Sequence, residues 1–326
     1  MRIAINGLGR IGGNILKLAI EKGLNIVAVN DITDSRSIAY FLQHDSVYGP
    51  YSKKISYDKN SLTIGGKKIK FFSEKNPENL PWKELNIDIV IESTGAFTDR
   101  EGASKHIRAG AKRVIISAPS NDSDVTIVPG VNDSDLKKNH EIISMGSCTT
   151  NCSATVAKII DDEFKIKKGF MSTIHAYTPS QKLLDNADKQ LRRGRAAALN
   201  IIPSSTGATI SVCQAIPSLL GKIDGLAFRV PVACGSIVDF VIEVKKETNV
   251  NEVNKKLKQA ANGKYKNILE YSEEELVSSD IIRNSHSAII DSLLTQVQGN
   301  TIKILAWYDN EFGYSCRMID LLKSMK

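Results

Sequence analysis

The chain has 326 residues, of which 42% are hydrophobic and 24% are charged. This length suits two domains, and the composition is that of a globular protein rather than a disordered one. No apolar run approaches the roughly 20 residues that span a bilayer. The N-terminus enters a strand pattern without the basic and apolar regions of a signal peptide, so we expect a cytoplasmic protein with no membrane partner.

The formal net charge is +7 and the lysines occur as scattered pairs, such as Lys53-Lys54 and Lys167-Lys168. Pairs of this kind with acids nearby are typical of a solvated surface. The alternative is that the positive charge attracts anionic small molecules. Nucleic-acid binding would require a clustered basic stripe within a recognisable module, and the sequence contains neither.

Apolar runs alternate with helical patterns through the first half of the chain. Strands are expected at residues 2–6, 25–31, 87–93, 113–119 and 125–128. An amphipathic helix follows the first of these strands and ends at Gly23. Such alternation is typical of a parallel sheet flanked by helices.

Three glycines, Gly7, Gly9 and Gly12, form a GxGxxG pattern between the first strand and its helix. The first glycine allows a tight turn, the second lets the backbone approach a pyrophosphate, and the third permits close helix–sheet packing. Asp31 ends the next strand, where a carboxylate can accept the ribose hydroxyls of NAD and repel the extra phosphate of NADP. The pattern favours NAD over the alternative of an ordinary glycine turn.

A lone thiol, Cys148 in "SMGSCTTNCSA", precedes the pattern of a buried helix. A cysteine at a helix N-terminus commonly has a lowered pKa, roughly 3.5–7.5, because the helix dipole stabilises the thiolate. His175 ends a strand-like run later in the chain and could act as a base only if folding brings it to the thiol. On spacing alone, an inert buried cysteine and a structural histidine are the favoured interpretations.

Five cysteines in a chain of this length argue against a disulfide framework, and no Cys/His metal spacing occurs, so no metal is expected. Cys148 and Cys152 are four residues apart and would share a helix face, which leaves a redox pair as a further alternative.

The second half of the chain has a different pattern. Residues 236–245 alternate between apolar and polar side chains, which predicts a half-buried antiparallel strand. Residues 302–309 look similar, and the last residues predict a closing helix. A domain boundary is expected near Ser147.

Blocks along the whole chain, among them "INGLGRIG", "SCTTNC", "HAYT", "LRRGRAAALNIIPSSTGA" and "WYDNEFGYS", resemble the phosphorylating glyceraldehyde-3-phosphate dehydrogenases. The resemblance implies oxidation of D-glyceraldehyde 3-phosphate, with NAD and inorganic phosphate, to 1,3-bisphosphoglycerate through a cysteine thioester, as in glycolysis and gluconeogenesis. It also implies a homotetramer.

The fold implied is α/β: a Rossmann-type doubly wound sheet plus an α+β catalytic domain with a mostly antiparallel sheet. Residues 1–147 would form the dinucleotide-binding domain, with a C-terminal helix at 312–326 packing back onto it. Residues 148–311 would form the catalytic domain.

The resemblance assigns Cys148 as the nucleophile and His175 as its base. The residues implied to bind the substrate phosphate and the attacking phosphate are Ser147, Thr149, Thr178, Thr206, Gly207 and Arg229. Those implied to bind the cofactor are Gly7, Gly9, Arg10, Ile11, Asp31, Lys75, Ser117 and Asn310. Arg195 would add positive potential, whereas Arg192 and Arg193 fit surface salt bridges at least as well.

Some positions depart from the family pattern. Lys75 replaces a frequent arginine, and Asn186-Ala187 replaces a Leu-Pro pair that is frequent in strictly NAD-dependent members. These departures leave NADP open as a poorer alternative cofactor. The stretch "ACGS" at 233–236 and Ile210 also differ, and none of these positions touches the thiol chemistry.

Two other functions remain open. An erythrose-4-phosphate dehydrogenase would release its thioester mainly to water, but that family lacks the Thr206-Gly207 pair present here. A redox-sensing or binding protein could keep the fold without turnover, but the intact set of Cys148, His175, Arg229 and Asn310 argues against it.

Overall fold

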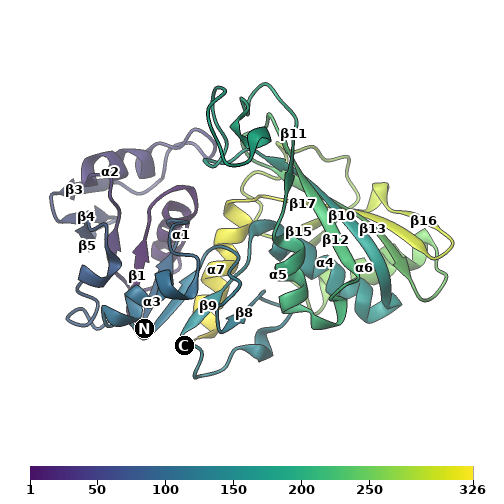
Figure 1. The fold of residues 1–326 in the computed structure, drawn as a ribbon, viewed down its shortest axis with the longest axis horizontal. Coiled ribbons are helices and arrows are strands. Elements are labelled where there is room, and N and C mark those ends of the chain that lie inside the picture. The colour runs from purple at the N-terminus through teal and green to yellow at the C-terminus, as the bar shows by residue number, and fades with distance from the viewer. Residues whose placement is uncertain (326) are drawn as a thin grey trace. The chain divides into compact units, whose positions relative to one another are not determined.

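The computed structural model describes residues 1–325 and divides into two compact units (Figure 1). Unit 1 comprises Met1–Ile127, Ser134–Gly146 and the residues from Ser315 onward, and unit 2 comprises Val128–Asp133 and Ser147–Tyr314. The expected domains differ from these units in one segment, because Val128–Asp133 groups with unit 2. The expected closing helix is α7, Phe312–Ser324, and the last residue of the expected range lies outside the described residues.

Unit 1 is built on a nine-stranded sheet in the order β3-β4-β5-β2-β1-β6-β7-β9-β8. Its strands are β1 (Ile3–Asn6), β2 (Ile26–Asn30), β3 (Ile55–Asp58), β4 (Ser61–Ile64), β5 (Lys67–Phe72), β6 (Ile89–Glu92), β7 (Arg113–Ile116), β8 (Val125–Thr126) and β9 (Ile142–Ser144). Only the β3–β4 and β4–β5 pairs are antiparallel. The sheet confirms the predicted parallel arrangement, whereas the antiparallel segment was not predicted.

The strands at the centre of this sheet are apolar along their whole length. Every residue of β1 and of β6 is buried, as expected for a parallel sheet that is covered on both faces. The helices of unit 1 are α1 (Arg10–Glu21), α2 (Ser35–Gln43), α3 (Arg100–Arg108) and most of α7. Helix α1 follows β1 after a three-residue turn, which places its N-terminus at the carboxyl end of that strand.

Unit 2 contains an eight-stranded sheet in the order β11-β12-β10-β13-β17-β15-β14, with β16 paired to β17. Its strands are β10 (Ile166–Ala176), β11 (Ile202–Ser205), β12 (Ile223–Val230), β13 (Ser236–Val244), β14 (Leu269–Ser272), β15 (Ala288–Asp291), β16 (Gln296–Gln298) and β17 (Thr301–Tyr308). Only the β10–β12 and β14–β15 pairs are parallel. The mostly antiparallel sheet predicted for the catalytic part is therefore confirmed.

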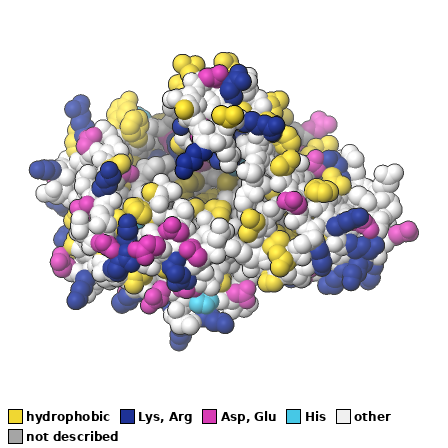
Figure 2. Space-filling view, in the orientation of Figure 1, with side chains coloured by type: hydrophobic (Ala, Val, Ile, Leu, Met, Phe, Trp, Pro, Cys, Tyr) yellow, Lys and Arg dark blue, Asp and Glu magenta, His cyan; other side chains and the backbone are white. Residues whose placement is uncertain are grey.

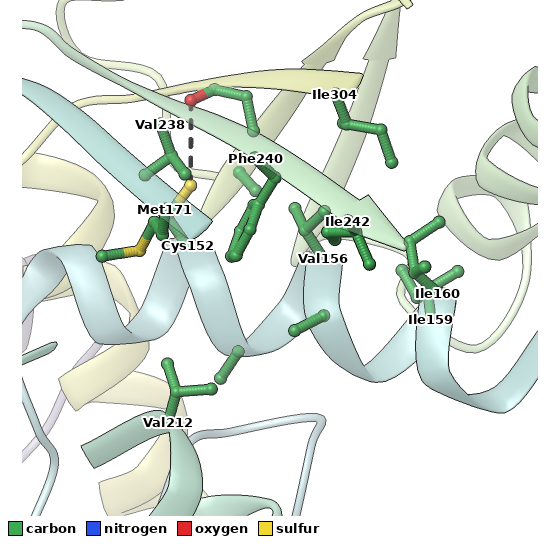
Figure 3. Close-up of a cluster of buried hydrophobic side chains, with 14 of the residues drawn as sticks. Cys152, Val156, Ile159, Ile160, Met171, Val212, Val238, Phe240, Ile242 and Ile304 are labelled. Atoms are coloured by element: carbon green, nitrogen blue, oxygen red, sulfur yellow. Dashed lines mark hydrogen bonds between the residues drawn. The ribbon is translucent and has the colours of Figure 1, made fainter. Parts of the chain in front are cut away.

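Helix α4 (Cys148–Phe164) covers one face of this sheet, together with α5 (Ala208–Ala215) and α6 (Val250–Asn262). Figure 3 shows how the buried face of α4 meets the apolar side chains of β10, β13 and β17. The residues on the two sides of this contact are Cys152, Val156, Ile159 and Ile160 of α4, and Met171, Val238, Phe240, Ile242 and Ile304 of the sheet. This packing fixes the position of the first turn of α4.

Strand β13 has the alternation predicted from its sequence. Val238, Phe240, Ile242 and Val244 are buried, whereas Val241 between them is exposed. Within residues 1–325, no helix combines the length and the apolar character needed to cross a membrane. The Lys and Arg side chains on the visible face stand in several separate groups among carboxylates, without a continuous basic stripe (Figure 2).

Candidate active site

Cys148 is the first residue of α4, and its position is fixed by the capping of that helix. The Ser147 hydroxyl accepts a hydrogen bond from Thr150 N at 3.0 Å, and the Thr150 hydroxyl accepts one from Ser147 N at 3.1 Å. This reciprocal pair satisfies two backbone N–H groups and fixes the helix start. Cys148 is partly exposed there, as predicted for a thiol at a helix N-terminus.

The second cysteine of α4 has a different environment. Cys152 is fully buried, and its Sγ lies 3.9 Å from the Ala306 carbonyl oxygen (Figure 3). Every cysteine in the chain is free of disulfide bonds in this structure. Cys152 therefore belongs to the core, and only Cys148 is accessible at the start of the helix.

The fold brings His175 to the thiol. Its Nε2 lies 3.4 Å from Cys148 Sγ, and the side chain is only 3% exposed. The ring packs edge-on against Tyr308, with 5.9 Å between ring centroids. A nucleophile and a base within hydrogen-bonding reach, with the base held by its surroundings, form the arrangement used in covalent catalysis.

Strand register brings Arg229 to the same place. His175 and Arg229 are direct partners in the parallel pair of β10 and β12. Arg229 Nη1 lies 2.6 Å from His175 Nδ1 and donates to the Ala176 carbonyl oxygen at 3.2 Å. Its Nε is buried without a hydrogen-bond partner, and no carboxylate among residues 1–325 forms an ion pair with it. A cation in this state is suited to receive an anionic ligand.

The electrostatics differ from the sequence prediction in one respect. Burial raises the pKa of the Cys148 thiol, and the Arg229 charge and the backbone at the start of α4 oppose this only in part. The expected lowered pKa is therefore wrong for the free protein, because desolvation outweighs the helix dipole. Burial, and then the Arg229 charge, lower the pKa of His175 to about 3. The pair is thus a neutral thiol beside a neutral imidazole.

A second arginine near this site was not predicted from the sequence. Arg193 donates to the Ser205 carbonyl oxygen at 3.3 Å, and its Nε is buried without a partner. Burial, and to a smaller extent the Arg193 charge, lower the pKa of Arg229. Arg195, by contrast, is exposed and pairs with Asp185 at 2.9 Å. The run of three arginines in "LRRGR" carries no signal that separates these two environments.

The hydroxyls expected to bind phosphate have partners within the protein. Thr149 is buried, and its hydroxyl lies 2.9 Å from Tyr308 Oη. Thr178 follows β10, and its hydroxyl donates to Gln181 Oε1 at 2.9 Å. The Nε2 of Gln181, which is itself 8% exposed, has no partner. Because a hydroxyl can both donate and accept, each remains able to bind one further group.

Thr206 and Gly207 lie at the N-terminus of α5. Thr206 Oγ1 accepts from Ala208 N at 3.1 Å, which leaves its O–H free to donate outward. Gly207 is the exposed N-cap residue, and no side chain caps the helix through it. Since the first backbone N–H groups of a helix have no intrahelical acceptor, this end can receive an anion.

The glycine turn of unit 1 has the geometry that its pattern predicts. Gly7 has a φ of +90°, and a side chain on Gly12 would lie 1.9 Å from the Gly7 carbonyl oxygen. A side chain on Gly9 would meet nothing within 4 Å, and no side chain caps α1. The uncapped helix start and the open space above Gly9 fit the pyrophosphate of a dinucleotide.

The other expected cofactor residues of unit 1 lie at or near the carboxyl ends of its strands. Asp31 follows β2 and accepts from Leu8 N at 2.7 Å and from Thr33 N at 2.9 Å, which holds the carboxylate in place beside the glycine turn. Ile11 lies in the first turn of α1, beside Arg10, which forms an ion pair with Asp45 at 2.8 Å. Lys75 is exposed after β5, and Ser117 directly follows β7.

Asn310 belongs to unit 2, and its side-chain amide is held in one orientation. Its Oδ1 accepts from Gly235 N at 3.1 Å and from Ser236 Oγ at 3.0 Å. Ser236 Oγ also accepts from Ala176 N at 3.1 Å, which ties the amide to the strand of the base. Asn310 Nδ2 is left as a donor without a partner among residues 1–325. The departure at 233–236 thus supports the expected nicotinamide residue.

No cluster of side chains suited to a metal ion occurs in the described part of the chain. The site therefore combines a thiol, a base and an unpaired arginine in unit 2, and unit 1 separately contains the dinucleotide turn.

Comparisons with known proteins agree with this arrangement. Residues 1–100 match the family model of the glyceraldehyde 3-phosphate dehydrogenase NAD binding domain, and residues 147–310 match that of the C-terminal domain. The chain is 52% identical to glyceraldehyde-3-phosphate dehydrogenase 2 of Trichormus variabilis, over 98% of this chain and 97% of the relative. It is 50% identical to the glyceraldehyde-3-phosphate dehydrogenase of Geobacillus stearothermophilus over the same shares, and 48% identical to that of Borreliella burgdorferi over 100% and 99%. The chain belongs to the glyceraldehyde 3-phosphate dehydrogenase family, and its cofactor is NAD.

Proposed function

We propose that this protein is the phosphorylating glyceraldehyde-3-phosphate dehydrogenase of glycolysis and gluconeogenesis. The observation that carries the proposal is the grouping of an accessible thiol, a neutral base at 3.4 Å and an arginine without a carboxylate partner. The thiol and the base suit an aldehyde, and the arginine suits the phosphate that the aldehyde carries.

In the first step, Cys148 Sγ attacks the aldehyde carbon and the thiol proton passes to His175, giving a hemithioacetal. The backbone N–H groups at the start of α4 point toward the position of the developing oxyanion and stabilise it. A neutral histidine is needed here, because an imidazolium could not accept the proton. The pKa of about 3 keeps His175 in that form at neutral pH.

NAD, when bound, accepts the hydride that converts the hemithioacetal into a thioester on Cys148. The glycine turn and the uncapped start of α1 would hold its pyrophosphate, and Asp31 would hold the adenosine ribose. Asn310 Nδ2 would donate to the carboxamide oxygen, since its Oδ1 is already engaged by two donors. His175 holds the proton released in this step.

Inorganic phosphate then attacks the thioester carbon, the C–S bond breaks, and an acyl phosphate leaves while Cys148 recovers its thiol. Gly207, Thr206 and Arg193 would position this phosphate, supported by the open end of α5 and the unpartnered Nε of Arg193. The substrate's own phosphate would be held by Arg229 and Thr178. Ser147 and Thr149 would contribute through their remaining hydrogen-bonding capacity.

The assignment to glyceraldehyde 3-phosphate is tested by NADH formation with that substrate and with erythrose 4-phosphate, each with and without phosphate. We expect kcat/KM to be at least about tenfold higher for glyceraldehyde 3-phosphate. A preference for erythrose 4-phosphate would overturn the proposal in favour of that sister activity. Absence of turnover with both would favour a redox-sensing or binding role.

We further propose a homotetramer acting in the cytoplasm, with NADP as a poorer cofactor. The proposed oligomer rests on the family, and the weaker NADP use rests on Asp31, whose carboxylate would face the extra phosphate. The Asn186-Ala187 pair softens this preference. Asp31→Ala should weaken NAD binding and improve NADP use, and a wild-type protein that prefers NADP would contradict this role of Asp31.

A further inference from the structure

The imidazole of His175 has two neighbours at Nδ1 that make opposite demands on it. The Ala176 carbonyl oxygen, at 2.7 Å, can only accept a hydrogen bond, whereas Arg229 Nη1, at 2.6 Å, can only donate one. A neutral Nδ1 carries a proton or a lone pair, but not both. It can therefore satisfy one of these neighbours at a time.

The two possibilities correspond to the two tautomers of the ring. With Arg229 in place, an Nδ1 proton would point at a guanidinium N–H only 2.6 Å away, so Nδ1 must accept and the proton must reside on Nε2. Arg229 Nη1 also donates to Ala176 O at 3.2 Å, so one cation serves both acceptors. Without Arg229, Nδ1–H would donate to Ala176 O, and Nε2 would carry the lone pair.

The tautomer decides whether His175 can act as a base. The atom that faces the thiol is Nε2, at 3.4 Å from Cys148 Sγ. If Nε2 carries the proton, it cannot accept another one from the thiol. The arrangement seen in the free protein therefore keeps the base in its inactive tautomer.

We propose that Arg229 gates the tautomer of His175, and that the phosphate group of the substrate opens this gate by drawing the guanidinium away. The inference rests on the proposed function, because it identifies the anion as the phosphate of the aldehyde substrate. The charged oxygens of a phosphate are stronger acceptors for a guanidinium than a neutral imidazole nitrogen. The buried Nε of Arg229, which has no partner in the free protein, gains one in the same movement.

In this movement one proton leaves Nε2 and one arrives at Nδ1 by exchange with solvent, so the charge of the ring does not change. Nδ1–H then donates to Ala176 O, and the Nε2 lone pair faces Cys148 Sγ. Arg229 is thus a positioning residue for the base in addition to its contact with the phosphate. Aldehydes without a phosphate would leave the base in the wrong tautomer even at saturation.

The test is a measurement of the tautomer itself. The full-length protein is labelled with ¹⁵N-histidine, and magic-angle-spinning ¹⁵N spectra distinguish protonated from unprotonated ring nitrogens. The spectrum of His175→Asn identifies the signals of His175 among the five histidines of the chain. The probe is glycerol 3-phosphate, which carries the phosphate but no aldehyde, and glycerol is the control without phosphate.

We expect Nε2–H in the free wild type, Nδ1–H with glycerol 3-phosphate, and no change with glycerol. Arg229→Met should show Nδ1–H without any ligand. The matched control Arg192→Met removes the same charge from an exposed position and should behave as wild type. The proposal is overturned if the free wild type already has Nδ1–H or an imidazolium, or if saturation with glycerol 3-phosphate leaves Nε2–H. It is also overturned if folded Arg229→Met keeps Nε2–H.

A kinetic measurement provides a second test. The NADH burst with unphosphorylated glyceraldehyde should accelerate at least about tenfold when phosphite is added, since a competent tautomer populated at a tenth or less limits the rate in that proportion. Arg229→Met should show no such acceleration, and an equal acceleration in both proteins would contradict the gate. If glyceraldehyde 3-phosphate is turned over but the tautomer does not change, the gate fails and the proposed function stands. If it is not turned over, the proposed function fails, while the spectra of the free proteins still decide the gate.

Discussion

The glycine turn of unit 1 allows three similar substitutions to be predicted separately. In Gly12→Ala the new Cβ would lie 1.9 Å from the Gly7 carbonyl oxygen and 2.6 Å from Ser93 Oγ. Ordinary contact begins near 3.4 Å, so the turn must move by about 1.5 Å. Gly7 cannot yield easily, because its own Cα lies close to the Thr94 backbone and its φ is +90°.

The same change at the two neighbouring glycines serves as the control. In Gly9→Ala the Cβ meets nothing within 4 Å, and the φ of −68° at this position suits alanine. In Gly13→Ala the nearest atom is Leu42 Cδ2 at 3.1 Å, the end of a flexible side chain. Neither variant should lose more than about 1 kcal/mol of unfolding free energy.

The expected results are as follows. Gly12→Ala should lose about 3 kcal/mol or more of unfolding free energy and should not bind NAD measurably. Gly9→Ala should keep its stability but bind NAD at least about tenfold more weakly, a loss of about 1.4 kcal/mol, because its methyl group occupies the space of the pyrophosphate. Gly13→Ala should resemble wild type in both measurements.

Urea unfolding of the free proteins and calorimetric titration with NAD measure the two quantities. Unchanged NAD affinity in Gly9→Ala would show that the backbone at this position does not approach the cofactor. Full stability and binding in Gly12→Ala would refute the reasoning about the turn as a whole.

Three further predictions concern the thiol and its base. Cys148→Ser should abolish turnover and labelling of the site by stoichiometric iodoacetamide, whereas Cys152→Ser should keep most turnover; the reverse result would reassign the nucleophile. His175→Asn should slow the NADH burst by about 10²–10⁴-fold, the usual contribution of a general base, and an unchanged burst would remove it from the mechanism. Because the pKa of His175 is lowered to about 3 in the folded protein, from 6.5, the unfolded chain binds the proton more readily. The stability this group contributes is complete above pH 6.5 and is lost as the pH falls toward 3, so the wild type should lose roughly 3 kcal/mol more than His175→Asn between pH 7 and pH 4 in urea unfolding. Equal losses in the two proteins would contradict the lowered pKa.

The parts of the fold that the sequence predicts are those set by local rules. The glycine turn, the helix that begins at Cys148 and the alternation of β13 each depend on neighbouring residues, and each is found in the structure. The antiparallel pairs β3–β4 and β4–β5 were missed, although Gly65-Gly66 between β4 and β5 is a turn signal. Their strands are short and their pattern mixes lysines with apolar residues, which hides the alternation.

The site could be predicted only in part, because its geometry depends on pairing between distant segments. That His175 and Arg229 share a register follows from the parallel pairing of two strands separated in sequence. The burial that raises the pKa of Cys148 likewise depends on tertiary packing, so the helix dipole alone predicted the wrong direction. Arg193 and Arg195 look alike in the sequence, and only the structure separates a buried unpartnered Nε from an exposed ion pair.

The central claim is that phosphate, not water, releases the acyl group from Cys148. An attacking anion must be held close and in line, and Thr206 with Gly207 at the open end of α5 provides that position. Thr206→Ala removes one donor to a charged oxygen, worth about 1.5–3 kcal/mol, and should slow release by roughly 10–150-fold. The NADH burst that precedes phosphate attack should survive in this variant.

The most direct measurement is steady-state NADH production by the wild-type protein as inorganic phosphate is varied, together with identification of the product. We predict a steep dependence on phosphate and an acyl phosphate as the product. Equal turnover without phosphate, with the free acid as the product, would contradict the phosphorylating function and leave the hydrolytic, erythrose-4-phosphate type of reaction in its place.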